Sequence, residues 1–270
     1  MKGLFFQREH KALPIQLIIS VSFTIVSICC MGILGFTLYR FLVQKMEDIT
    51  IESSEQILDQ TAINLETYLR NMRRISDTMY YSVIKDKDLA TDTMAEEMNL
   101  LYEANKDNLI SIACYTNEGE LVAAVPVATE KEDIRIVEQE WFTDAVGRME
   151  NFHFSTPHVQ NLFDNTSYRY YWVISLSRAV ELTNNGSSRL GVLLVDMNYS
   201  SIEQLLKKAN VNHSMEYVYL IDREGEIIYH PRQKLLNMHL LEENNQIAAS
   251  YEDGSHKEYF QDEERLITVK

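Results

Sequence analysis

The feature that most constrains this chain is an apolar run from Ile15 to Leu38, whose 24 residues include no acidic or basic side chain. At about 1.5 Å of rise per residue, a helix of this length covers about 36 Å and can cross a hydrocarbon core of about 30 Å. A cleaved signal peptide usually has an apolar region of about 7–15 residues and then small residues, which Leu38-Tyr39-Arg40 does not offer. The sequence therefore predicts a retained transmembrane helix at residues 15–38, followed by a large soluble part.

Basic residues give the orientation of this helix. Three of them precede the run and two follow it closely, at Arg40 and Lys45. Positive charge near a membrane helix favours the cytoplasmic side, and acidic residues count little. We therefore expect residues 1–14 to form a cytoplasmic tail of a single-span protein of the cell membrane, with the soluble part extracytoplasmic. The opposite orientation stays open.

Charge and cysteine content exclude several classes of protein. The chain has a formal net charge of −15, and residues 40–270 carry 22 basic against 39 acidic side chains. Such a surface repels nucleic acid and anionic lipid, so neither is an expected partner. Cys29 and Cys30 lie in the apolar run, which leaves Cys114 alone in the soluble part. A disulfide framework or a cysteine-rich zinc site within that part is excluded.

A long helix is expected to follow the membrane span. No proline or glycine occurs between Leu42 and Val83, and apolar residues recur from Leu58 onward in steps of three and four. Such spacing marks one face of a helix. The sequence predicts a stalk helix over residues 39–85. Its apolar stripe is either the seam of a homodimer or the face that packs on the chain's own domain, and both can hold along different stretches.

Beyond the stalk the pattern changes to that of a mixed α+β region. Residues 109–115 and 120–125 alternate like strands around a short turn that contains Gly119. The other expected elements are helices within 87–105, 141–149 and 200–209, and strands at 152–155, 168–177 and 189–197, the last two joined by a loop at 184–188.

A second hairpin follows the same layout. Residues 217–222 and 226–229 flank a Glu-Gly turn, as in the first hairpin. Two copies about 110 residues apart predict two similar modules, at 86–210 and 211–270. Residues 266–270 look like a strand that has just begun, and no second apolar span follows. The second module is therefore expected to be incomplete.

No catalytic or metal-binding pattern occurs in the sequence. There is no HExxH or GxSxG motif and no phosphate-binding glycine loop. His153 and His158 are five residues apart, which on a strand places them on opposite faces. We expect no enzyme activity, no metal and no cofactor. Tyr168, Tyr170 and Trp172 would share one strand face, either packed or lining a pocket.

These features together resemble a known family, the double Cache sensor region of bacterial membrane sensor histidine kinases. The residues that carry the resemblance are the membrane span, the long helix, and the motifs at 141–142 (Trp-Phe), 154–157 (Phe-Ser-Thr-Pro), 173–178 (Val-Ile-Ser-Leu-Ser-Arg), 191–196 (Gly-Val-Leu-Leu-Val-Asp) and 219–231. The resemblance implies two PAS-like Cache modules with antiparallel sheets on a long helix, with a small-molecule ligand in the membrane-distal module, 86–210. It also implies a second membrane helix and a kinase domain, which belong to a longer parent protein.

The resemblance also implies a ligand site. The amino-acid-binding branch of the family has an arginine two positions before a Trp-Tyr pair, a tyrosine on the next strand and an aspartate that ends a later one. Trp141 and Asp196 match this pattern, whereas Gln139, Phe142 and His158 stand at the other three positions. Without the arginine that holds a carboxylate, a free amino acid is not expected as the ligand.

The residues themselves leave alternatives open. Trp141 could stack on a ligand or anchor its helix on the sheet. Asp196 ends an apolar strand, where a carboxylate must be paired or hydrogen-bonded, so it could cap a turn or hold a ligand cation. Two functions are consistent with the sequence. One is the ligand-sensing input of a two-component receptor, and the other is a membrane-anchored surface protein whose ectodomain is an enzyme or binds a partner.

Overall fold

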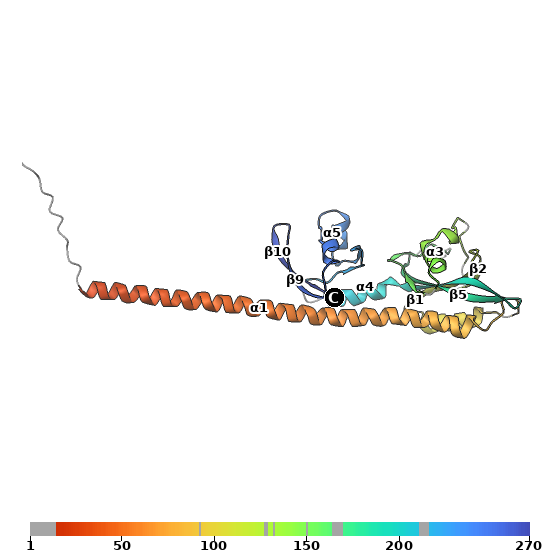
Figure 1. Cartoon of the computed structure of the whole chain (residues 1–270), viewed down its shortest axis with the longest axis horizontal. Helices are drawn as coiled ribbons and strands as arrows, with labels where there is room; N and C mark the ends of the chain where they lie inside the picture. Colours follow the sequence, from red (N-terminus) through yellow and green to blue (C-terminus); the bar gives the residue numbers. More distant parts are fainter. Residues whose placement is uncertain are drawn as a thin grey trace, which may run out of the picture. The chain divides into compact units, whose positions relative to one another are not determined.

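The computed structural model describes residues 15–91, 93–126, 129–131, 133–149, 151–163, 170–210 and 216–270 (Figure 1). The chain divides into a unit that ends at Glu55 and a second unit, Gln56–Lys270. The first described element, α1 (Ile15–Thr78), belongs to both units and continues as a π-helical turn, Met79–Ile84. The predicted long helix is thus confirmed.

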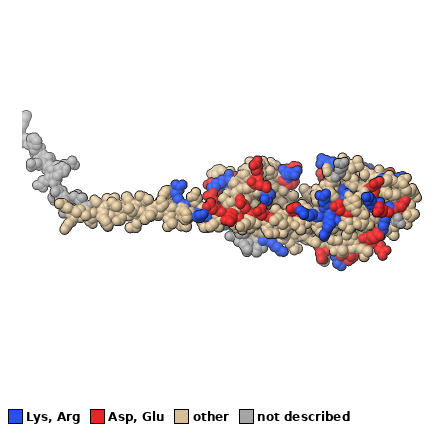
Figure 2. All heavy atoms as spheres, turned by 60° about the horizontal axis from the view of Figure 1, so that its bottom comes forward, with Lys and Arg blue, Asp and Glu red and all other residues tan. Residues whose placement is uncertain are grey.

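The N-terminal part of α1 is long and apolar enough to cross a membrane by length and composition. Its large side chains, such as Ile19, Phe23 and Ile33, are exposed. Figure 2 shows this stretch without charged side chains. The span at residues 15–38 and its orientation stay predictions.

A six-stranded antiparallel sheet forms the centre of the second unit. Its strands are β1 (Leu109–Thr116), β2 (Leu121–Val125), β3 (His153–Phe154), β4 (His158–Val159), β5 (Trp172–Asn184) and β6 (Ser187–Asn198). The order is β2-β1-β6-β5, and the short strands β3 and β4 both pair with the outer side of β5. The helices around it are α2 (Ala95–Asn105), the 3-10 turn Ile136–Glu138, α3 (Glu140–Gly147) and α4 (Tyr199–Ala209).

Alternation along β6 gives this sheet two different buried faces. Leu193 and Val195 point toward α1, where they share a core with Met72. Leu194, one step along the strand, belongs to a second core with Phe142 of α3. Strand side chains alternate between faces, so α1 and α3 cover opposite sides of the sheet (Figure 1).

The turn between β5 and β6 is tighter than the sequence suggested. Asn185 and Gly186 have φ values of 50° and 71°, and the flanking Asn184 and Ser187 still pair. Two residues with positive φ form the hairpin turn that Asn-Gly favours. The five-residue loop expected at 184–188 is therefore wrong. Asp88 fixes the turn, since its carboxylate accepts the amide N–H of Asn185 at 2.9 Å and of Gly186 at 2.7 Å.

The start of β5 also differs from the prediction. The strand begins at Trp172, so Tyr170 precedes it. Tyr170 and Trp172 therefore do not share a strand face, although the sequence leads us to expect one. Tyr168 lies outside the described residues.

The β5–β6 hairpin is also attached to α1, at two points. At its base, the Tyr68 hydroxyl donates to the carbonyl of Asn198 at 2.9 Å. Near its middle, Arg178 forms an ion pair of 2.7 Å with Asp77 and stacks on the ring of Phe152. The guanidinium is largely buried, because only 15% of the Arg178 side chain is exposed.

Replacing Asp77 by alanine should lower the free energy of unfolding by about 1–2 kcal/mol, because a largely buried guanidinium loses its charged partner. Chemical denaturation of the full chain in detergent measures this. Glu66→Ala is the matched control, since it removes an ion pair with Arg70 whose two side chains are mostly exposed, and surface pairs contribute little. If the two substitutions lower the free energy of unfolding equally, the ion pair of Asp77 with Arg178 contributes no more than an exposed one.

The C-terminal part contains two separate two-stranded sheets. Its elements are β7 (Leu220–Ile221), β8 (Ile227–Tyr229), α5 (Gln233–Asn237), α6 (Asn245–Ala248), β9 (Gly254–Phe260) and β10 (Glu263–Val269). The predicted second hairpin is confirmed in shorter form as β7–β8. The strand expected to begin at residue 266 begins at Glu263 and pairs along its whole length with β9. The two-module layout and the incompleteness of the second module stay predictions.

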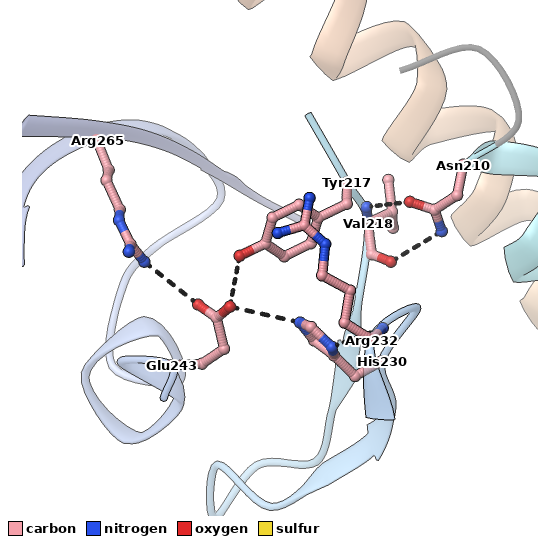
Figure 3. Close-up of polar contacts among 7 residues, drawn as sticks. All are labelled: Asn210, Tyr217, Val218, His230, Arg232, Glu243 and Arg265. Carbon is pink, nitrogen blue, oxygen red and sulfur yellow. Dashed lines mark hydrogen bonds and ion pairs between the residues drawn. The ribbon is translucent and has the colours of Figure 1, made fainter. Parts of the chain in front are cut away.

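A buried carboxylate, that of Glu243, connects these two sheets (Figure 3). It accepts a hydrogen bond from the Tyr217 hydroxyl, lies 3.4 Å from His230 Nε2 and 3.5 Å from Arg265 of β10. Only 5% of the Glu243 side chain and none of the His230 side chain is exposed. His230 Nδ1 accepts the N–H of Arg232, which leaves Nε2 as the protonated nitrogen that faces Glu243.

Candidate ligand-binding site

Asp196 lies near the end of the central strand β6, on the sheet face that α3 covers, and only 2% of it is exposed. In register with it are Ser111 on β1 and Ser175 on β5. Ser111 Oγ donates to Asp196 Oδ2 at 2.6 Å, and Ser175 Oγ donates to Oδ1 at 2.5 Å. The carboxylate is thus held from both neighbouring strands and belongs to the sheet rather than to the turn that follows it.

The environment of Asp196 disfavours its charge. Burial raises the pKa of Asp196, and the hydrogen bonds from Ser111 and Ser175 and the nearby His158 offset this only in part. A carboxylate placed in an apolar sheet costs free energy unless a cation or further donors compensate it. An ionised Asp196 is therefore costly in this environment.

His158 reaches the same group of polar side chains from β4. Its Nε2 lies 3.4 Å from Ser175 Oγ, and its Nδ1 lies 3.2 Å from Ser155 Oγ and 2.9 Å from the carbonyl of Thr156. Because a carbonyl only accepts, Nδ1 carries a proton. Ser175 therefore connects His158 to Asp196, which brings together two of the predicted site residues.

Helix α3 places the other predicted residues differently. Trp141 is partly buried, with its ring centroid 5.6 Å from that of Tyr115 and its carbonyl hydrogen-bonded by Ser177 Oγ at 2.8 Å. Phe142 is buried in the core beneath α3. Gln139 precedes α3, and its side-chain amide lies 3.5 Å from the carbonyl of Arg135. Trp141 thus packs on Tyr115 and is bonded to Ser177 of β5, whereas Phe142 is part of the core.

Sequence reasoning missed four residues of this region. Ser111 and Ser175 are small polar residues at inward positions of apolar strands, and that is the signal that could have identified them. Tyr115 and Glu130 are less visible from the sequence, and their side chains interact with each other across the sheet face that α3 covers.

A separate hollow of about 470 Å³ opens beside the second half of β5. It is lined in part by Tyr80, Arg178 and Arg189, and none of the five predicted site residues contributes to it. Among the described residues, no group of three or more His, Cys, Asp and Glu side chains could hold a metal ion.

An antiparallel sheet with one face on a long helix, and with a buried carboxylate and an aromatic helix on the other, defines the class of this domain as α+β. The family model of the Cache domain matches residues 43–270. The chain therefore belongs to the Cache domain family, which confirms the family part of the resemblance.

Several solved structures share this fold. The ligand-binding domain of the Pseudomonas aeruginosa PAO1 amino acid chemoreceptor PctC, in complex with GABA, is 16% identical, with a TM-score of 0.57 over 81% of this chain and 91% of that chain. That of PctB from the same organism, with L-Gln, is 15% identical, with a TM-score of 0.54 over 78% and 80%. That of Pseudomonas fluorescens CtaA, with L-serine, is 15% identical, with a TM-score of 0.53 over 77% and 84%. The comparison with curated proteins finds no match.

Proposed function

We propose that this chain is the extracytoplasmic, small-molecule-sensing input region of a two-component sensor histidine kinase, anchored by residues 15–38. The observation that carries the proposal is Asp196, a carboxylate buried in an apolar sheet and held by Ser111 and Ser175. Family membership supports a ligand-binding role. In this proposal the ligand lies between the sheet and α3 and contacts Trp141 and Asp196, with Gln139, Phe142 and His158 defining the rest of the site.

The ligand is proposed to lack the carboxylate of a free amino acid. The solved relatives are amino acid chemoreceptors by name, and the resemblance implies an arginine at the position of Gln139. The amide of Gln139 cannot form the paired, charge-assisted hydrogen bonds with which arginine holds a carboxylate. The nearby Arg135 is exposed and paired with Glu138.

The signal is proposed to pass to α1 and through it to the membrane helix, within a homodimer formed along residues 39–85. The attachments of β5 and β6 to Tyr68 and Asp77 of α1 support this route. Cross-linking of full chains that carry single cysteines on the exposed side of α1, for example at Ile63, tests the dimer.

The chain contains two tryptophans, which allows a direct test of the site. In a Trp172→Phe variant the remaining tryptophan is Trp141, and we expect its emission to change saturably with at least one member of a panel of amines, sugars, short peptides and organic acids. Asp196→Asn in the same background should weaken that response by more than about tenfold, because a buried charged contact is lost.

The control is Trp141→Phe, which leaves the exposed Trp172 and should show no response. Absence of any saturable change across the panel, or a change that Asp196→Asn leaves intact, would contradict a ligand site at Asp196 and favour the alternative of a partner-binding or enzymatic ectodomain. The kinase context is tested by reading the coding region beyond codon 270 for a second apolar span and a histidine kinase domain.

A further inference from the structure

The outer edge of β5 is covered by other segments along only part of its length. Strand β3 pairs with Leu176 and Ser177, and further along β5 the carbonyl of Thr183 accepts the N–H of Leu89 at 2.8 Å. Between these two attachments lie residues 178–182, and no segment in the described part of the chain pairs with them on that side. This stretch of β5 is therefore an open sheet edge.

The register of the β5–β6 hairpin shows which backbone groups this edge presents. Asn184 and Ser187 close a two-residue turn, so the even-numbered residues of β5 exchange hydrogen bonds with β6 and the backbone groups of the odd-numbered ones point outward. Thr183 fits this rule, because its carbonyl is used on the outer side. The N–H and C=O of Ala179 and Glu181 point the same way, and no described residue bonds to them. Unpaired groups of this kind invite a further strand.

A cation lies on one side of the open edge. The hollow of about 470 Å³ runs along this edge, with Ala179 and Glu181 in its lining. Arg189, also in the lining, pairs with Leu182 and therefore projects from the face that packs on α1. Its side chain is exposed and has no ion pair among the described residues, whereas Arg178 in the same hollow already has a carboxylate partner. This side of the hollow thus favours an anionic group.

The other side of the open edge is largely apolar. Leu190 pairs with Glu181 and projects from the face away from α1. The exposed Met149, which follows α3, lines the hollow as well. The carboxylate of Glu181 is hydrogen-bonded by the Ser188 hydroxyl. An extended segment at this edge would therefore meet a cation on one side and apolar side chains on the other.

Both ends of the open edge are closed. Strand β3 and Leu89 occupy the row of the next strand on either side of the gap, and at about 3.4 Å per residue the Cα atoms of residues 178 and 182 are about 14 Å apart. A second copy of the chain carries the same two flanks on its own β5, so the two open edges cannot reach each other. A gap of this length instead fits a free peptide of about three to five residues.

We propose that the open edge of β5 binds a short extended peptide by strand addition, and that Arg189 selects an acidic residue at the centre of that peptide. The peptide runs antiparallel to β5, as β3 does. Two of its residues exchange N–H···O=C bonds with Ala179 and Glu181, and their side chains lie on Met149 and Leu190. The residue between them projects toward Arg189. A simple anion would satisfy the N–H groups of this edge and leave its carbonyls unpaired.

Calorimetric titration of the full chain in detergent with the peptide acetyl-Ser-Val-Glu-Val-Ser-amide tests this proposal. We expect saturable binding, and an affinity about fivefold lower when glutamine replaces the glutamate of the peptide, because an exposed ion pair contributes little more than that. N-methylation of either valine should abolish binding, since both valine N–H groups face β5. N-methylation of the glutamate, whose N–H faces away, should leave the affinity unchanged.

Two variants of the chain examine the same contacts from the other side. Ala179→Pro removes one outward N–H and keeps the bonds to β6, since proline is tolerated where the N–H of an edge strand faces outward, and it should abolish binding. Arg189→Gln should weaken the glutamate peptide about fivefold and leave the glutamine peptide unchanged. Arg223→Gln, an exposed arginine in the β7–β8 turn, is the matched control and should change nothing. If Ala179→Pro fails to fold, the N-methylated peptides decide with the wild-type chain.

Absence of saturable binding would overturn the proposal, and so would an equal loss from N-methylation at all three positions. If Asp196→Asn abolishes peptide binding and Ala179→Pro leaves it intact, the peptide is a ligand of the candidate site, which would overturn the edge site while supporting the proposed function.

Discussion

Replacing Glu243 by alanine should lower the free energy of unfolding by about 3–5 kcal/mol, the range seen when one member of a buried charged pair is removed. The substitution leaves Arg265, His230 and Tyr217 without their common acceptor (Figure 3). It also breaks the polar connection between β7–β8 and β9–β10. Chemical denaturation of the full chain in detergent, followed by circular dichroism, measures the loss.

The effect should depend on pH in a defined direction. Burial raises the pKa of Glu243, but the contacts with His230, Tyr217 and Arg265 outweigh it, so the pKa lies below its usual range. A carboxyl with a lowered pKa stabilises the fold above the unfolded value of about 4.3 and loses that contribution as the pH falls through the folded value. The difference between Glu243→Ala and wild type should therefore be full at neutral pH and shrink in acid.

The neighbouring exposed residue Glu242 is the matched control for this effect. Glu242→Ala should change stability by less than about 0.5 kcal/mol, as surface substitutions usually do. If both alanine variants unfold at the same denaturant concentration, the Glu243 cluster is not a stabilising connection.

Asp196→Asn should have two opposite effects, a gain in stability at neutral pH and a loss of ligand affinity of more than about tenfold. The affinity loss follows because truncating a buried charged contact costs about 2–5 kcal/mol. The gain follows because asparagine keeps the shape and can still hydrogen-bond Ser111 and Ser175, while it removes a charge whose burial raises the pKa of Asp196.

The sign of the pH dependence follows from the same shift. A carboxyl whose pKa is raised on folding contributes stability that is complete below its unfolded value of about 3.9 and is lost as the pH rises through the folded value. The advantage of Asp196→Asn over wild type should thus grow between about pH 4 and neutral pH. Denaturation across this range measures it, with the exposed Asp107→Asn as control. A difference that stays constant with pH would show that Asp196 carries no charge penalty.

Much of the fold could be predicted because it depends on local pattern. The helix α1 follows from an unbroken apolar stripe without proline or glycine after Leu42, and β1 and β2 follow from alternation around Gly119. Strand β9 was missed because its sequence, Gly-Ser-His-Lys-Glu-Tyr-Phe, lacks that alternation and is defined by pairing with β10. The sequence suggests a longer loop around Asn185 because the residues there are polar. Asn184 and Ser187 belong to the strands only because β5 and β6 pair in this register.

The candidate site could also be predicted only where the signal is local in the sequence. Asp196 could be identified because a carboxylate that ends an apolar strand needs compensation. Its partners Ser111 and Ser175 are 85 and 21 residues away in the sequence, and no local pattern gives the register that joins them. Phe142 was placed at the site because it stands at the tyrosine position of the family's Trp-Tyr pair. Neighbouring positions on a helix face different directions, and Phe142 packs into the core beneath α3.

The attachments of the β5–β6 hairpin have a mechanical consequence. The hairpin is pinned at its tip by Asp88, near its middle by Asp77 and at its base by Tyr68. A strand fastened at three places along its length cannot slide past the segment that holds it without breaking all three attachments together. We therefore expect the central strands and the adjoining part of α1 to move together as one rigid unit. We expect β3 and β4 to move more easily, because each is joined to β5 by two residue pairs.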